Sequence, residues 1–155
     1  LMYNSFEPKV ANRFIMYVDG IPSYLIRKAQ RPTFKNGETQ MKHMNSQRWI
    51  KGRSEWDAMT GIELYDPIVP SAAQAVMEWV RLHHESVTGR DGYADFYKKD
   101  ITINMLGPVG DKVEEWKLQG AFITNASFGD ISWEEDGTPL LITLDLRFDK
   151  AILQY

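Results

Sequence analysis

The sequence predicts a mainly β domain, an antiparallel β-barrel or sandwich with one amphipathic α-helix over residues 71–86. Several segments alternate apolar and polar residues with the period of two that a half-buried strand requires. Asp-Gly pairs, which suit tight turns, lie between some of these segments, and only one stretch follows helical spacing. At 155 residues, the chain is expected to form a single domain over residues 1–155.

The clearest strand is predicted at residues 140–149. Apolar residues share one of its faces, namely Ile142, Leu144, Leu146 and Phe148. Polar residues share the other, namely Thr143, Asp145 and Arg147. Ile131 and Trp133 also alternate with polar residues, just before an Asp-Gly pair, so residues 131–134 are predicted to form a hairpin with this strand. The polar face of such a sheet is available for a role other than filling a core.

The beginning of the chain predicts an arm followed by a hairpin. Residues 1–12 show no clear period and contain a proline, so they are expected to form a flexible arm. Residues 13–18 and 24–26 are predicted to be two strands that pair with each other through Asp19-Gly20. Both faces of this pair are largely apolar, so both are expected to be covered.

A second hairpin is predicted between residues 39 and 53, with Asn45-Ser46-Gln47 as its turn. It is basic and also carries Met and Trp residues. One interpretation is a solvated hairpin whose apolar side chains point inward. The other is an arm that docks on a neighbouring subunit, because exposed apolar residues usually mark contacts. The residues expected to make that contact are Met41, His43, Met44, Arg48, Trp49, Ile50, Lys51 and Arg53.

Residues 55–65 predict one long strand. In a regular strand Asp57, Met59 and Glu63 would lie on one face, and Ile62 and Leu64 on the other. Further along the chain, residues 99–106 and 115–119 predict two more strands. Their inward residues are expected to be Ile101, Ile103, Met105, Trp116 and Leu118.

The helix is predicted to begin with a capping box, because Ser71 and Gln74 can each bond the other's free backbone N–H. One face of it carries an apolar stripe of Ala72, Ala75, Val76, Trp79, Val80 and His83. A single amphipathic helix among strands is expected to cover an open face of the sheet or the end of a barrel.

Composition limits the class of protein. There are 18 Lys and Arg residues against 21 Asp and Glu, a net charge of −3, which argues against a dedicated nucleic-acid binder. Cysteine is absent, which excludes disulfides and thiolate chemistry and suits assembly in a reducing cytoplasm. No apolar run approaches a membrane span and no signal-peptide pattern opens the sequence. The first residue is leucine, so residues upstream of Leu1 can be missing.

No motif for catalysis, a metal or a cofactor emerges. His83 and His84 are adjacent, so on a helix their side chains point about 100° apart and do not share an ion easily. Asp57 and Glu63 would be about 20 Å apart along a strand, too far to act as a carboxylate pair. The sequence therefore predicts a protein that is not an enzyme. An enzyme on a small β-barrel and a nucleic-acid-binding barrel remain as alternatives, and only residues 39–53 approach the pattern of the latter.

The order of these segments resembles the major tail tube proteins of contractile-tailed bacteriophages of the T-even kind. The resemblance covers most of the chain and is strongest over residues 116–125, Trp-Lys-Leu-Gln-Gly-Ala-Phe-Ile-Thr-Asn. The other matching positions are Ala11-Asn12-Arg13-Phe14, Trp56, the helix over residues 75–79, Gly129, Trp133, Leu144 and Leu146.

The resemblance implies a structural subunit that forms hexameric rings, stacked into a hollow conduit for DNA ejection inside a contractile sheath. It also implies a virion location, assembly in the host cytoplasm, no cofactor and no membrane. The implied partners are further copies of the chain, the sheath, baseplate and tail-terminator proteins, the tape measure protein and DNA. The alternatives are a baseplate protein that initiates the tube, or the tube subunit of a contractile injection or secretion system.

The resemblance also suggests roles for two surfaces. By the layout of that family, the basic hairpin over residues 39–53 is expected to contact the adjacent ring, where it could meet acidic groups near residues 134–136. A second set of polar residues is expected to line the lumen or contact another subunit: Asp57, Glu63, Thr143, Asp145 and Arg147. Which face of the sheet is luminal stays open at this point.

Overall fold

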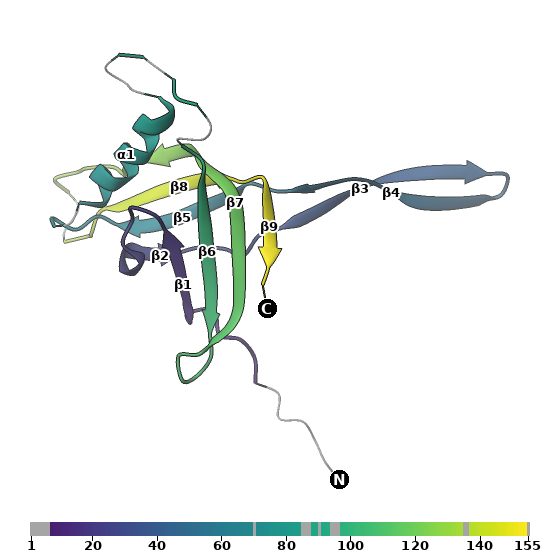
Figure 1. The fold of residues 1–155 in the computed structure, drawn as a ribbon, viewed down its shortest axis with the longest axis horizontal. Helices are drawn as coiled ribbons and strands as arrows, with labels where there is room; N and C mark the ends of the chain where they lie inside the picture. Colours follow the sequence, from purple (N-terminus) through teal and green to yellow (C-terminus); the bar gives the residue numbers. More distant parts are fainter. Residues whose placement is uncertain are drawn as a thin grey trace, which may run out of the picture.

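The computed structural model describes residues 7–69, 71–84, 88–89, 91–93, 97–134 and 137–154 (Figure 1). The elements in chain order are β1 (Phe14–Val18), the 3-10 helix η1 (Ser23–Leu25), β2 (Ile26–Lys28), β3 (Phe34–His43), β4 (Ser46–Trp56), β5 (Met59–Tyr65), α1 (Ala72–His83), β6 (Lys99–Leu106), β7 (Lys112–Ser127), β8 (Leu141–Arg147) and β9 (Lys150–Leu153). The prediction of a mainly β fold with one helix is confirmed.

Seven strands form one antiparallel sheet in the order β1-β6-β7-β8-β5-β2, with β9 also paired to β7. The long strand β7 bends where Gly120 adopts a φ of 69°. Before the bend β7 pairs with β6 and β9, and after it β7 pairs with β8. The bend therefore folds the sheet over itself into a nearly closed barrel, while β3 and β4 form a separate two-stranded sheet.

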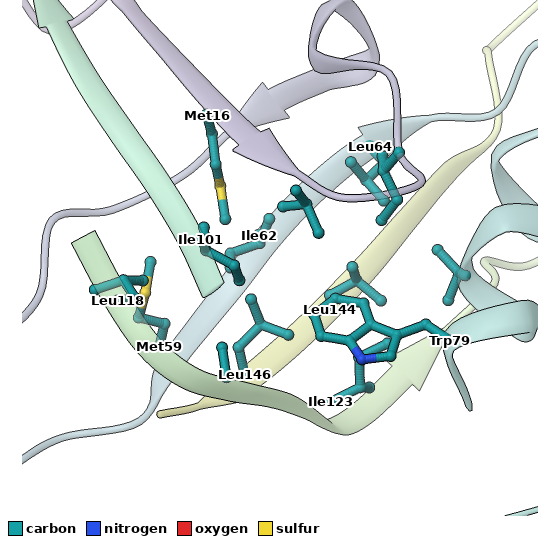
Figure 2. Packing of buried hydrophobic residues seen from close by; sticks show 14 of the residues in the cluster. Met16, Met59, Ile62, Leu64, Trp79, Ile101, Leu118, Ile123, Leu144 and Leu146 are labelled. Carbon is teal, nitrogen blue, oxygen red and sulfur yellow. The ribbon is translucent and has the colours of Figure 1, made fainter. Parts of the chain in front are cut away.

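The core lies between the two halves of the bent sheet and the helix (Figure 2). The inward residues predicted for β6 and β8 are buried, including Ile101 and Ile103 on β6 and Leu144 on β8. Trp79 of α1 is also buried, and Figure 2 shows it lying close to Leu144 and Ile123. The helix thus covers part of the core, as its apolar stripe predicts.

The predicted start of the helix and the Ser71 half of its capping box are confirmed. The Ser71 hydroxyl accepts a hydrogen bond from the Gln74 backbone N–H at 3.4 Å, which satisfies one of the free donors of the first turn. The Trp79 indole N–H donates to the Tyr97 carbonyl at 2.6 Å and ties the helix to the segment before β6. The helix ends at His83 rather than at 86, because His84 has an extended backbone; residues 85–87 lie outside the described part of the chain.

The predicted pairing of the first two strands is wrong. β1 pairs with β6 and β2 pairs with β5, so these strands lie at opposite ends of the sheet order. The residues between them contain η1, which carries the chain across the end of the barrel and buries Leu25 there. The expectation that both faces are covered is also wrong, since Tyr17 is 46% exposed.

The long strand predicted over residues 55–65 is interrupted. β4 ends at Trp56 and β5 begins at Met59, and a register shift separates Met59 from Ile62. Gly61 has a φ of 73°, and the irregularity places both Met59 and Ile62 in the core. Met59 was predicted to lie opposite Ile62, and that prediction is wrong because one extra residue reverses the alternation. Asp57 lies in the link between β4 and β5, so it shares no strand face with Glu63.

The hairpin predicted between residues 131–134 and β8 is also wrong. β7 extends to Ser127, and its second half takes the place beside β8 that residues 131–134 were expected to fill. The described residues of the β7–β8 connection, 128–134 and 137–140, are outside any strand. Ile131 is 89% exposed and Trp133 is fully exposed, so their local alternation does not bury a face.

Candidate assembly surfaces

The β3–β4 hairpin projects away from the barrel along the longest axis of the molecule (Figure 1). Its pairing runs from Phe34 opposite Trp56 to His43 opposite Ser46. Every residue of β3 is exposed, and in β4 only Gly52 and Trp56 are partly buried. Trp49 is 58% exposed and Met44 is 94% exposed. The predicted hairpin is present, but its turn lies at Met44 and Asn45 rather than at Asn45-Ser46-Gln47, because Ser46 and Gln47 already pair with β3. The interpretation in which its Met and Trp residues point inward is wrong.

Both faces of the hairpin combine apolar and basic side chains. Cross-strand partners share a face of a two-stranded sheet. One face holds Thr39 with Ile50 and Met41 with Arg48. The other face holds Gln40 with Trp49, and Glu38 with Lys51. The sequence from 39 to 53 contains four Lys and Arg residues (Lys42, Arg48, Lys51 and Arg53) and no acid. The hairpin can therefore contact an apolar and acidic surface on either side.

The tip of the hairpin has an unusual backbone. Met44 has a φ of 50°, the one non-glycine residue with positive φ among the described residues. Tight hairpin turns usually place Asn, Asp or Gly in this left-handed region, because a larger side chain is strained there. The turn itself would favour a different residue at position 44. A strained, exposed methionine at this position is therefore a candidate for contact with another protein.

The base of the hairpin is held by an aromatic cluster. The Trp56 ring lies 4.9 Å from that of Phe34, 6.4 Å from that of Trp116 and 6.1 Å from that of Phe148, centroid to centroid. Trp116 and Phe148 belong to the barrel, so Trp56 links the hairpin to it. Lys35 adds an ion pair to Asp57 at 3.7 Å. The direction of the hairpin is therefore set by contacts at its base.

The polar residues predicted to line a lumen or contact another subunit do not all lie together in the structure. Glu63 and Thr143 are direct neighbours across β5 and β8. Glu63 accepts a hydrogen bond from Arg27 at 3.0 Å. Arg147 lies further along β8 and is exposed, whereas Asp57 lies in the link at the base of the hairpin.

Asp145 lies on the same polar face of β8, and its carboxylate accepts two hydrogen bonds from neighbouring residues of its own subunit. One carboxylate oxygen accepts a hydrogen bond from the Gly61 N–H at 3.1 Å, and the other accepts one from the Asn125 side chain at 3.3 Å. Asp145 thereby stabilises the irregularity in β5. Both carboxylate oxygens of Asp145 are therefore engaged within the subunit.

Sequence reasoning missed a buried carboxylate at Glu114. It accepts hydrogen bonds from Lys9 at 2.8 Å and from Arg31 at 3.2 Å. Burial alone would raise the pKa of Glu114, but the hydrogen bonds from Lys9 and Arg31 outweigh it, so the pKa lies below its ordinary value. Glu114 lies two residues before Trp116 and four before Leu118, so in a strand it faces the same way as these two residues. Both were predicted to face inward, so the spacing could have indicated that Glu114 is buried.

The Glu114 cluster joins two segments that are distant in the sequence to β7. Lys9 belongs to the segment expected to be a flexible arm, and Arg31 follows β2. A cavity of about 210 Å³ lies beside them, lined by Lys9, Ala11, Phe14, Ala29, Gln30, Arg31, Ile103 and Met105. Two cations from distant segments thus converge on one buried anion and tie the described residues of the arm to the sheet.

The described residues hold no group of three or more His, Asp and Glu side chains arranged to bind a metal ion. His84 forms a pair with Asp91, with Nδ1 2.8 Å from a carboxylate oxygen, and the side chain of His83 is outside the described set. None of the helices in the described part of the chain has the length and apolar character needed to cross a membrane.

Solved structures share this fold over nearly the whole chain. A chain in the cryo-EM structure of the PVC sheath/tube terminator of an extracellular contractile injection system, in its extended state, is 16% identical with a TM-score of 0.77, covering 98% of this chain and 100% of that one. A chain in the cryo-EM structure of the anti-feeding prophage (AFP) tube-terminating cap is 16% identical with a TM-score of 0.73, covering 99% and 95%. Hcp1 from Flavobacterium johnsoniae is 13% identical with a TM-score of 0.51, covering 91% and 94%. No protein-family model and no curated protein matches the sequence.

At these identities the likeness establishes the fold. The chain has the bent, nearly closed β-barrel with one helix that occurs in contractile tube assemblies. The fold implied by the resemblance to tail tube proteins is therefore confirmed.

Proposed function

We propose that the chain is a structural subunit of a contractile-tail tube, which forms hexameric rings that stack into a hollow conduit. The observation that carries this proposal is the β3–β4 hairpin, which projects from a tube-type barrel with exposed apolar side chains and an excess of basic ones. A surface of this composition is stabilised by contact with another protein. Fold likeness to chains of tube assemblies along nearly the full length supports the same conclusion.

The free edges of the sheet support assembly in a ring. β1 and β2 end the sheet order, and β9 pairs only with β7. Unpaired edges favour uncontrolled strand pairing unless they are covered or joined to a neighbour. Closed rotational symmetry pairs each edge with the same partner surface and leaves none open. Six copies, each with a net charge of −3, would also give an acidic ring that does not bind DNA phosphate tightly.

The proposed partners are further copies of the chain, a sheath protein, and baseplate and terminator proteins at the two ends of the tube. In a phage tail the lumen would hold a tape measure protein and then DNA. The subunit would be assembled in the host cytoplasm and act in the virion tail. No catalytic role is proposed.

A second candidate is the tube subunit of a contractile injection system, or the baseplate protein that starts such a tube. It is favoured by the structures compared above, which include a chain from an extracellular contractile injection system. The two candidates share the ring and the tube and differ in what passes through the lumen. Purification of the complete particles that contain this chain, followed by a test for encapsidated DNA, distinguishes a phage from an injection device.

Electron microscopy of the purified chain tests the shared part of the proposal. Rings of uniform diameter, or tubes of uniform bore, are expected at high protein concentration. Analytical ultracentrifugation of the same samples gives the number of copies in a ring. A chain that stays monomeric at every concentration reached, also with sheath protein added, would contradict the proposal.

A further inference from the structure

The sulfur chemistry of this chain is confined to methionine. The sequence holds seven methionines and no cysteine, so no thiol of the chain competes for an oxidant. Among the described residues, three methionines are buried, with at most 8% of each exposed: Met16, Met59 and Met105. Met77 lies on α1 and is partly buried. The remaining described methionines, Met41 and Met44, both belong to the β3–β4 hairpin and are 53% and 94% exposed.

Met44 is the most open of the described methionines. It lies in the turn between β3 and β4, at the tip of the hairpin that projects from the barrel (Figure 1). This position is beyond the last cross-strand pair, His43 with Ser46, so Met44 has no partner across the hairpin. Met41, in contrast, lies opposite Arg48 and is about half covered. An oxidant in solution therefore reaches the thioether of Met44 before that of any other described methionine.

Peroxides convert an exposed methionine thioether to a sulfoxide. The sulfur lone pair attacks one oxygen of hydrogen peroxide, so a sulfur–oxygen bond forms and the oxygen–oxygen bond breaks. Sulfur is oxidised by two electrons and the peroxide is reduced. The transferred oxygen gives its proton to the departing hydroxide, which leaves as water. Methionine sulfoxide reductases reverse the change, with a dithiol supplying two electrons and two protons while the oxygen leaves as water.

The sulfoxide changes the tip of the hairpin from apolar to polar. A flexible apolar side chain becomes a polar and chiral one. Under the proposed function, the exposed apolar side chains of the hairpin are covered by another protein, and a polar oxygen buried there without a donor is unfavourable. Met44 is outside the core, so the same oxidation leaves the packing of the subunit unchanged. Oxidation at the tip therefore acts on association and spares folding.

We propose that Met44 is a reversible oxidation site through which peroxide controls assembly of the subunit. Oxidation of the free chain to the Met44 sulfoxide blocks the contact of the hairpin, and a thiol-dependent methionine sulfoxide reductase restores it. In the reducing cytoplasm proposed for assembly, Met44 stays reduced until a partner covers it. The covered sulfur is then out of reach of the oxidant. The inference rests on the proposed function and adds a means of regulating it.

Peptide mapping tests the site itself. Tryptic digestion releases residues 43–48 as one peptide, in which Met44 is the only methionine. After brief treatment of the folded, free chain with dilute hydrogen peroxide, mass spectrometry should find one added oxygen on this peptide. The reaction should be about tenfold or more faster there than on the peptides that hold the buried Met16 and Met105. Equal rates at the three residues would overturn the inference.

Assembly of the oxidised chain tests the control. Oxidation of free subunits should raise the critical concentration for tube formation about tenfold or more, and reductase with a thiol should restore the original value. Circular dichroism of the oxidised chain should match that of the untreated chain. An oxidised chain that assembles at the original concentration would overturn the inference.

Two substitutions at the tip separate oxidation of Met44 from other damage. Met44→Leu keeps an apolar side chain of similar volume and removes the sulfur, so it should assemble before and after peroxide. Met44→Gln imitates the polar sulfoxide and should assemble poorly even without peroxide. Met41→Leu, on the same hairpin, is the matched control and should stay sensitive to peroxide. If Met44→Leu loses assembly after peroxide as fully as the unaltered chain, the proposed site is wrong.

Peroxide added to preformed tubes tests the order of events. Met44 should be oxidised about tenfold more slowly in tubes than in free subunits, because the partner covers it. Equal rates would overturn the inference, since the sulfur would then lie outside the contact. Failure of the proposed function looks different: the unaltered, reduced chain forms no rings or tubes at all. Control of assembly then fails with it, and the peptide map still decides whether Met44 is the preferred oxidation site.

Discussion

The barrel and the hairpin use the same secondary structure for different purposes. The barrel strands bury one apolar face against the other half of the sheet and the helix, so their apolar residues stabilise the subunit itself. The hairpin has two faces, and no described residue of its own chain covers them. An isolated two-stranded sheet is only marginally stable in water. The comparison indicates that apolar residues in the barrel stabilise the fold, whereas those in the hairpin are left exposed; their role in association is part of the proposed function.

This distinction predicts that substitutions in the two regions separate stability from assembly. Four tests follow, in decreasing order of the expected effect on the free energy of unfolding.

Trp79→Ala should have the largest effect. Trp79 is the buried tryptophan of α1, and its indole N–H donates a hydrogen bond to the Tyr97 carbonyl. Removing the indole leaves a cavity and should lower the free energy of unfolding by about 3–5 kcal/mol. Urea denaturation followed by circular dichroism measures it. Trp49→Ala, at the exposed tryptophan of the hairpin, is the control and should change stability by less than about 0.5 kcal/mol. Equal losses from the two variants would break the distinction.

Gly120→Ala should come next. Gly120 has a φ of 69°, and a Cβ there would overlap the carboxylate of Asp149. Strain and overlap together should lower the free energy of unfolding by about 2–4 kcal/mol. Gly110→Ala has a similar backbone strain, with a φ of 84°, but open space around the Cβ, and should lose only about 1 kcal/mol. A loss at Gly120 no larger than that at Gly110 would show that contact with Asp149 is unimportant for the bend in β7.

Glu114→Gln should lower stability at pH 7 by about 1–3 kcal/mol, because Lys9 and Arg31 lose an ionised acceptor. The folded-state pKa of Glu114 lies below its ordinary value of 4.5, so its contribution is complete above that value. The contribution is then lost as the pH falls through the folded pKa. Chemical denaturation between pH 7 and pH 3 should therefore show a steeper loss for the natural chain than for Glu114→Gln. Parallel curves would show that the ion pairs of Glu114 with Lys9 and Arg31 do not cause the loss of stability at low pH.

The double variant Trp49→Asp and Ile50→Asp should have the smallest effect on stability. Both residues lie in the exposed part of the hairpin, so the free energy of unfolding should change by less than about 0.5 kcal/mol. Assembly should nevertheless be lost, because two charges would enter an apolar contact. Negative-stain electron microscopy should show subunits or single rings without stacked tubes. Normal tubes would show that this part of the hairpin is not the contact between rings.

Several features of the fold were predictable because they depend on neighbours in the sequence. Ser71 and Gln74 form the helix start from within one turn. The inward residues of β6 and β8 follow from a period of two, which survives wherever a strand is regular. The hairpin over residues 39–53 was recognisable from its composition and from the two β-like segments around Asn45, although its turn lies one residue earlier than predicted and its strands extend further toward Phe34 and Trp56.

The wrong strand pairings share one physical cause, which is competition between segments distant in the sequence. Ile131 and Trp133 have the pattern of a strand, but the second half of β7 occupies the position beside β8. β1 and β2 lie close together in the sequence, yet β6 and β5 are their partners. At Met59 a single irregularity, supported by Asp145 from β8, reverses the alternation that the sequence suggests.

The same division applies to the candidate surfaces. The sequence by itself determined that the hairpin is basic and apolar at once, and that no catalytic motif accompanies it. Only the tertiary structure decided that no described part of the chain covers the hairpin, that Trp133 is exposed, and that Lys9 and Arg31 meet at Glu114. Composition and local alternation are properties of neighbouring residues. Exposure and ion pairing depend on which distant segments the folded chain brings into contact.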